Sequence, residues 1–152
     1  MIFISHRGNT TGKSENWENE PTYIDMAIKD GYDVEVDVWV KSEFYGSQLY
    51  LGHDTPQYGI NLSWYEERRD NLWIHCKNHQ AVDYFSNTKF NWFWHDKDDM
   101  TLTSNGYIWV YPGKQPINNS VAVLPELHTD DVSKCVGICS DIIEEYRNAF
   151  IR

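Results

Sequence analysis

Two carboxylates two positions apart, Glu35 and Asp37, stand in a run of alternating valines over residues 33–40. Side chains two positions apart on a strand point the same way. Neighbouring carboxylates repel each other and are costly to bury unless a positive charge lies between them. A divalent cation would supply that charge, because Mg²⁺ and Ca²⁺ prefer carboxylate oxygens. An edge strand with a solvated acidic face would carry the same pattern, so the spacing alone leaves both interpretations open.

Two histidines follow two other strand-like runs. His6 ends an apolar run and precedes Arg7 and Gly8, and His53 ends a run that returns from a turn. Phosphodiester cleavage requires a base for the nucleophile and an acid for the leaving alkoxide, and histidine does either near neutral pH. Arginine presents a planar fork of donors that matches phosphate oxygens, and glycine lets the backbone pass close to a ligand. These residue types together favour phosphodiester chemistry.

The spacing of apolar residues predicts the elements that position these groups. Strands are predicted over residues 1–5, 33–40, 48–52, 72–76, 91–95, 107–111, 121–124 and 136–140, and helices over 21–29, 79–86 and 142–150. Pro21 in the first turn and Gly31 after the last turn are the expected signals of a helix. A polar loop over residues 8–20 joins the first strand to this helix.

Composition limits the class of protein. A chain of 152 residues with 41% hydrophobic and 24% charged residues is typical of one globular domain, residues 1–152. The net charge of −10 predicts no binding to nucleic acid or anionic lipid. The 7 Trp, 10 Tyr and 6 Phe fill a core or stack on sugar rings and bases.

Targeting signals and cysteines favour the cytoplasm. No apolar run approaches the ~20 residues of a membrane span, and the first residues lack the pattern of a secretory signal. The three cysteines, Cys76, Cys135 and Cys139, are odd in number and match no metal-binding spacing. We expect reduced, mostly buried thiols.

Four short motifs resemble those of the glycerophosphodiester phosphodiesterase family, in order and nearly in spacing. The family's HRG, P-E-N, E-x-D and H-D motifs correspond to His6-Arg7-Gly8, Ser14-Glu15-Asn16, Glu35-Val36-Asp37 and His53-Asp54. Residues 72–77 are similar to its next strand, which carries E-x-K, and residues 137–141 to its terminal strand, which ends in Asp. The resemblance covers residues 2–54 most closely.

The resemblance implies a role for each matching residue. His6 and His53 would be the acid and base, Glu35 and Asp37 would ligate a divalent metal ion, Arg7 and Lys77 would bind phosphate, and Glu15 would flank the same site. It also implies a TIM-type (β/α) barrel. Because such a barrel typically needs ~250 residues, we expect a reduced or distorted form with several helices missing.

The chain departs from the family pattern at two motif positions. Ser14 replaces the usual proline, and His75 stands where a third ligating carboxylate is expected. Nitrogen ligation by His75 would favour Mn²⁺ or Zn²⁺ over Ca²⁺. Otherwise the ion, Mg²⁺, Ca²⁺ or Mn²⁺, would be held by two carboxylates and water, or by a further carboxylate such as Glu126 or Asp96.

An aromatic run over residues 92–96 ends at the same predicted mouth, where Trp94 or His95 either packs in the core or faces a substrate. The overall prediction is a metal-dependent phosphodiesterase that cleaves a glycerophosphodiester-like or sugar-phosphate diester by acid/base catalysis with two histidines. The alternatives are a non-catalytic module that binds phosphosugars or carbohydrates, and a lyase that forms a cyclic phosphate. The sequence indicates no oligomeric state.

Overall fold

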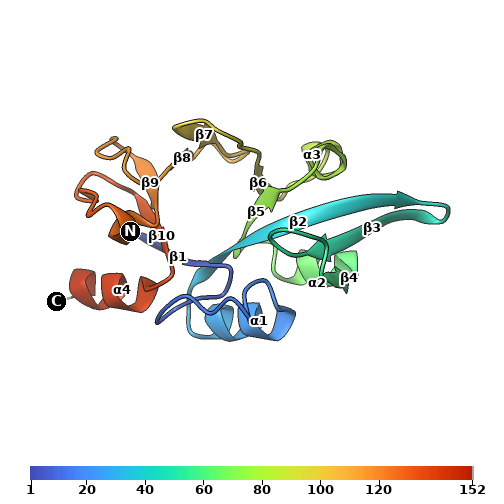
Figure 1. The fold of residues 1–152 in the computed structure, drawn as a ribbon, viewed down its shortest axis with the longest axis horizontal. Coiled ribbons are helices and arrows are strands. Elements are labelled where there is room, and N and C mark those ends of the chain that lie inside the picture. The colour runs from blue at the N-terminus through green and yellow to red at the C-terminus, as the bar shows by residue number, and fades with distance from the viewer. Residues whose placement is uncertain (152) are drawn as a thin grey trace.

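The computed structural model describes residues 1–151, and its ten strands join in one mixed sheet (Figure 1). The strands are β1 (Ile2–His6), β2 (Asp33–Glu43), β3 (Gly46–Leu51), β4 (Tyr58–Ile60), β5 (Leu72–Cys76), β6 (Asn91–Phe93), β7 (Met100–Leu102), β8 (Ile108–Val110), β9 (Ser120–Val123) and β10 (Gly137–Ser140). The helices are α1 (Pro21–Lys29), α2 (Leu62–Glu67), α3 (His79–Ser86), α4 (Ile143–Ile151) and the short 3-10 helix η1 (Pro125–Leu127).

Seven strands form a parallel series in the order β6-β5-β2-β1-β10-β9-β8. β3, β4 and β7 run antiparallel to their neighbours. The first half of β2 pairs with β1 and β5, whereas its second half pairs with β3 in a long hairpin that projects from the sheet (Figure 1). The carboxyl ends of parallel strands meet at one edge, so residues far apart in sequence come together there.

The helices lie outside the curve that the strands follow (Figure 1). One apolar cluster joins α1 and α3 to β2 and β5, with Ile24, Val36 and Phe85 among its buried members. A smaller one places Ile143 of α4 against Ile138 of β10. A third cluster consists of side chains on the opposite face of the strands, and we call it the inner layer: Ile4, Trp73, Phe93, Trp109, Val121 and Cys139.

The prediction of a reduced TIM-type (β/α) barrel is wrong. Residues 1–151 form a mixed ten-stranded sheet with only four α-helices, whereas a TIM-type barrel surrounds eight parallel strands with eight helices. The difference arises largely after β6, where β7, β8 and β9 follow one another without an α-helix. Turn-forming residues such as Asn105-Gly106 and Pro112-Gly113 join these strands.

Most individual elements were predicted correctly. The helices over residues 21–29 and 79–86 and the strand over 72–76 match α1, α3 and β5, and the other predicted elements are found with shifted ends. The strands β4 and β7 and the helices α2 and η1 were not predicted. The three cysteines are free and buried, as expected. Within residues 1–151 no helix has the length and apolar character that crossing a membrane would require.

Candidate active site

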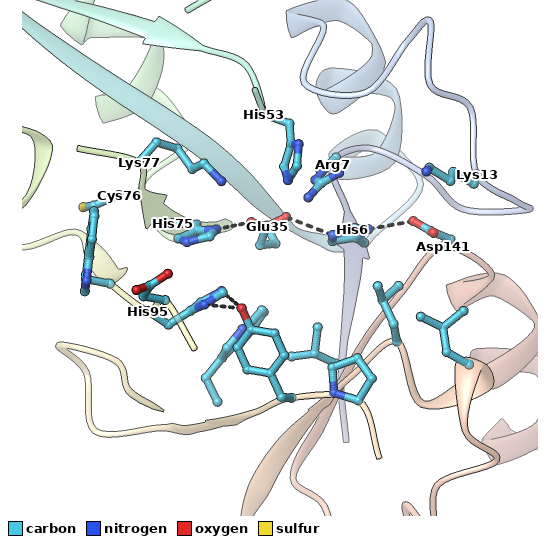
Figure 2. Close-up of a pocket in the computed structure, with 18 residues that line it drawn as sticks. His6, Arg7, Lys13, Glu35, His53, His75, Cys76, Lys77, His95 and Asp141 are labelled. Carbon is cyan, nitrogen blue, oxygen red and sulfur yellow. Dashed lines mark hydrogen bonds and ion pairs between the residues drawn. The ribbon is translucent and has the colours of Figure 1, made fainter. Parts of the chain in front are cut away.

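A cavity of about 620 Å³ opens beyond the inner layer (Figure 2). Six of its lining residues lie two positions after an inner-layer residue: His6 after Ile4, His75 after Trp73, His95 after Phe93, Tyr111 after Trp109, Val123 after Val121, and Asp141 after Cys139. Glu35 follows Asp33 of β2 at the same spacing. Because side chains alternate along a strand, each pair faces the same side of the sheet. The strands that build the core therefore also aim the polar groups at one cavity.

Glu35 and Asp37 are both buried, and His75 lies beside them. His75 Nδ1 is 3.0 Å from Asp37 Oδ1 and 3.7 Å from Glu35 Oε1. One ligand atom from each of the three residues lies within 4.8 Å of the others. The structure thus brings together the three predicted metal ligands.

Asp37 is surrounded by cations. Arg7 Nε lies 2.9 Å and Lys77 Nζ 3.6 Å from its carboxylate oxygens. Burial alone would raise the pKa of Asp37, but His75, Arg7 and Lys77 together hold that pKa well below its usual range. Asp37 is therefore ionised at neutral pH.

Glu35 is in the opposite electrostatic situation. Burial and the nearby charge of Asp37 raise the pKa of Glu35 to about 7. Its Oε2 atom has no hydrogen-bond partner among residues 1–151 and lies 3.8 Å from His6 Nε2. This oxygen can accept a cation or a proton.

Asn19 fixes the position of Asp37. Its side chain donates to Asp37 Oδ2 (2.9 Å) and accepts from the Asp37 backbone N–H (2.9 Å). Its own backbone N–H donates to the Arg7 carbonyl at 3.0 Å. Asn19 has a φ of +63°, a left-handed conformation that asparagine tolerates better than most residues. The loop over residues 8–20 is therefore tied directly to the buried carboxylate.

His6 is held by Asp141 at the end of β10. His6 Nδ1 lies 2.7 Å from Asp141 Oδ1, which also accepts from the Asn9 side chain at 2.8 Å. Burial lowers the pKa of His6, but the hydrogen bond to Asp141 and the charge of Glu35 outweigh it, so the net pKa is raised. With Nδ1 engaged, Nε2 is the ring nitrogen that remains for chemistry.

His53 reaches the same cavity from the loop after β3. Figure 2 places its ring near Arg7, above Glu35, and its Nδ1 lies 2.7 Å from Asp54 Oδ1. Gly52 makes this loop possible, because at its φ of +150° an added Cβ would lie 2.1 Å from the Thr55 carbonyl oxygen. His53 is half-exposed, unlike the buried His6.

Arg7 and Lys77 supply positive charge to the cavity (Figure 2). The Arg7 guanidinium contacts Glu18 at 3.2 Å and Asp37 at 2.9 Å, and its five N–H donors exceed what these contacts use. Gly8 follows Arg7 with a φ of +96°, and an added Cβ would lie 2.6 Å from the Tyr23 ring. The glycine therefore lets the chain pass close to Tyr23.

Two predicted positions lie at the margin of this arrangement. Glu15 is outside the lining of the cavity; its side chain is 77% exposed and pairs with Lys13 at 2.9 Å. Trp94 lines the cavity and is partly exposed at its rim. Glu126 accepts from the Ser140 hydroxyl and the Asp141 N–H, so it is engaged at the end of β10.

Several site residues were not assigned from the sequence. Glu18 and Asn19 lie in the loop over residues 8–20, where no periodic pattern indicates which side chains turn inward. Asp141 carried a signal, since it follows a predicted strand as His6 does. His95, considered with Trp94, stacks on His75 with ring centroids 4.2 Å apart.

His95 and Tyr111 line the same cavity next to His75. The Tyr111 hydroxyl hydrogen-bonds to the His95 ring. Burial and the neighbouring His75 lower the pKa of His95 to about 4. His95 is therefore neutral at physiological pH and adds no charge to the cavity.

Glu35, Asp37 and His75 fit a divalent ion. Glu35 Oε2 is buried without a hydrogen-bond partner among the described residues, and such an atom is costly unless paired. Asp37 Oδ1 has only the ion-pair contacts to His75 and Lys77, at 3.0 and 3.6 Å. The three ligand atoms lie within 4.8 Å of one another. They can therefore share one ion at metal–ligand distances of about 2.1–2.4 Å. Two oxygens and a nitrogen are the donor set that Mn²⁺ and Zn²⁺ accept more readily than Ca²⁺.

Comparison with protein-family models, with curated proteins and with solved structures finds no match for this chain. The assignment of function therefore rests on the site and on the order of its motifs.

Proposed function

We propose that the chain is a phosphodiesterase of the glycerophosphodiester phosphodiesterase type, which hydrolyses a small phosphodiester in this cavity. One observation carries the proposal: His6 and Arg7, His53, and Lys77, from three separate parts of the sequence, line a single cavity. Two groups that transfer protons and two that bind anions are what hydrolysis of a charged diester requires. The buried Glu35 completes the set.

The histidines would divide two proton transfers. Water bonds to phosphorus and gives a proton to one histidine, while the bond from phosphorus to the departing alcohol breaks and the other histidine protonates that oxygen. Arg7 and Lys77 would hold the non-bridging oxygens and stabilise their increasing charge. Asp141 would keep the His6 ring oriented through Nδ1, with Nε2 directed to the reacting atoms.

A divalent ion would be held by Glu35, Asp37 and His75. When bound, it supplies positive charge that neutralises the phosphate and polarises its oxygens. Asp37 already has cationic neighbours, so Glu35 gains most from an ion: its ionised form would then have the counter-charge that it otherwise lacks.

Turnover of bis(p-nitrophenyl) phosphate and of a glycerophosphodiester, with Mg²⁺, Mn²⁺ or Ca²⁺ added in turn, tests the proposal. His6→Ala and His53→Ala should each lower kcat by ~10²–10⁴. The double variant should fall little further, because members of one catalytic unit are non-additive. His79→Ala is the matched control, since His79 is exposed on α3 outside this cavity.

The products separate the proposal from its alternatives. An open phosphomonoester identifies hydrolysis, and a cyclic phosphate identifies attack by an adjacent substrate hydroxyl. Binding of inorganic phosphate without turnover of any diester would contradict the enzyme and favour a binding module. Full activity in both single variants would remove the histidines from the mechanism.

A further inference from the structure

The cavity has two chemically different sides. Its charged side comes from β1, β2, β5 and the loop after β3. Its other side, which we call the apolar wall, comes from the stretch between β8 and η1: Trp109, Tyr111, Pro112, Val123, Leu124 and Leu127. Tyr111 of this wall bonds to His95, and Figure 2 places His95 away from Arg7 and His53, beyond Glu35 and His75.

The apolar wall offers little to a polar ligand. None of its six residues is charged, and the Tyr111 hydroxyl is already bonded to His95. An acyclic polyol such as glycerol against this wall would lose hydrogen bonds to water without replacing them, which is costly. Apolar surface placed there would instead be removed from water favourably.

The wall is also open to a ligand. Leu127 is 63% exposed and lines the cavity, so its apolar side chain is accessible to a ligand there. The cavity volume of about 620 Å³ exceeds the needs of a phosphate group alone and lies within the range of pockets for whole small molecules.

We infer that the apolar wall binds the alcohol part of the substrate, and that this alcohol is aromatic or aliphatic rather than a polyol. The inference rests on the proposed function, since the cations of the charged side fix the phosphate end. The substrate class is then a phosphodiester with one apolar ester group, its phosphate facing Arg7 and Lys77 and that group facing Val123 and Leu127.

Binding of two phosphomonoesters tests this without requiring turnover. Phenyl phosphate and methyl phosphate carry the same charged group and differ only in the ester group. Calorimetric titration of the whole chain should give a Kd on the order of tenfold lower for phenyl phosphate, from the additional apolar area buried. Equal Kd values would overturn the inference.

Substitutions in the apolar wall test whether its residues cause the preference for phenyl phosphate over methyl phosphate. Leu127→Ser, and the double variant Val123→Thr with Leu127→Ser, should reduce the preference several-fold and leave the Kd of methyl phosphate nearly unchanged. Leu102→Ser is the matched control, because Leu102 is 64% exposed on β7 and does not line this cavity. An unchanged preference in the correctly folded double variant would place the apolar contact elsewhere and overturn the assignment.

The outcomes also distinguish this inference from the proposed function. A phenyl preference that depends on Leu127, in a chain that turns over no diester, supports the apolar wall and contradicts catalysis. Turnover with equal Kd values supports catalysis and contradicts the wall. Binding of neither ester, together with no turnover of any diester, contradicts both.

Discussion

His6 Nδ1 lies 2.7 Å from Asp141 Oδ1, although the two residues are 135 positions apart in the sequence. The contact follows from the parallel pairing of β1 with β10, in which Ser5 is the register partner of Ser140. His6 follows Ser5, and Asp141 follows Ser140 directly after β10. Both side chains line the cavity. Neither residue needs a long loop to reach the other.

Replacement of Asp141 should change the titration of His6. Asp141→Asn keeps a hydrogen-bond acceptor but removes the negative charge that stabilises the imidazolium, so the raised pKa of His6 should fall. NMR titration of the imidazole signals measures it, with exposed His79 in the same spectra as an internal reference. The catalytic proposal adds a loss in kcat of ~10²-fold. An unchanged His6 titration would mean that the contact does not hold in solution.

Metal-free protein should lose stability as pH rises through the titration of Glu35. The unfolded chain releases this proton near pH 4.5, whereas the folded chain holds it to about pH 7. Between these values the folded state binds more protons, so its free energy of unfolding falls as pH rises. In the presence of a chelator, the melting temperature of wild type should fall relative to Glu35→Gln across this window. A difference in melting temperature that does not change with pH would show that folding does not raise the pKa of Glu35.

Excess Mn²⁺ should reverse that trend. In the proposed site the ion would bind ionised Glu35 in the folded state alone, so it would stabilise more as the proton leaves. The melting temperature of wild type should then rise relative to Glu35→Gln over the same pH range. Identical melting curves with chelator and with Mn²⁺, Mg²⁺ or Ca²⁺ would contradict the metal site.

His75→Glu should change which metal is preferred. An additional carboxylate makes an all-oxygen site, which suits Mg²⁺ or Ca²⁺, whereas the native set includes nitrogen and suits Mn²⁺ or Zn²⁺. The variant keeps the side chain beside Asp37, whose Oδ1 lies 3.0 Å from His75 Nδ1. Metal titrations followed by thermal shift measure the order of preference. The same order in both proteins would remove His75 from the ligand set.

Asn19→Ala should destabilise the fold through Asp37. It removes two hydrogen bonds at 2.9 Å to a buried carboxylate residue, which costs about 1–3 kcal/mol. Asn119→Ala is the matched control, because Asn119 also has positive φ (+58°) and is exposed. Both variants carry the backbone cost of alanine at positive φ, so the difference in urea-unfolding free energy isolates the side-chain bonds. Equal losses of unfolding free energy in the two variants would show that the Asn19 side chain does not stabilise the fold through Asp37.

The sequence predicted the parts of the site that depend on strand alternation. Glu35 and Asp37 lie two apart on β2, and His75 and Lys77 two apart at the end of β5, so their common orientation follows from the strand itself. His6, at the end of β1, joins these four residues, so five of the predicted residues lie close together at the cavity.

Strand alternation does not predict which loop side chains turn inward or which strands pair over long distances in the sequence. Glu18 and Asn19 turn inward because of bonds to Arg7 and Asp37, which only the folded chain supplies. Glu15, three positions earlier, faces solvent, although its motif placed it in the site. The barrel was wrong because the resemblance covered residues 2–54 closely, while the helix-poor region lies after residue 93.

The alternation on β2 also protects the alignment of the sheet. Val36 and Val38 face the apolar cluster under α1 and α3, while Glu35 and Asp37, which alternate with them along β2, face the cavity side. Slippage of β2 by one residue against β5, or insertion of one residue into it, would exchange the two sets. Both carboxylates would then be forced into hydrocarbon and the valines into the charged cavity. The acidic pair therefore acts against misaligned sheets, so a chain that pairs its strands wrongly loses stability and the site together.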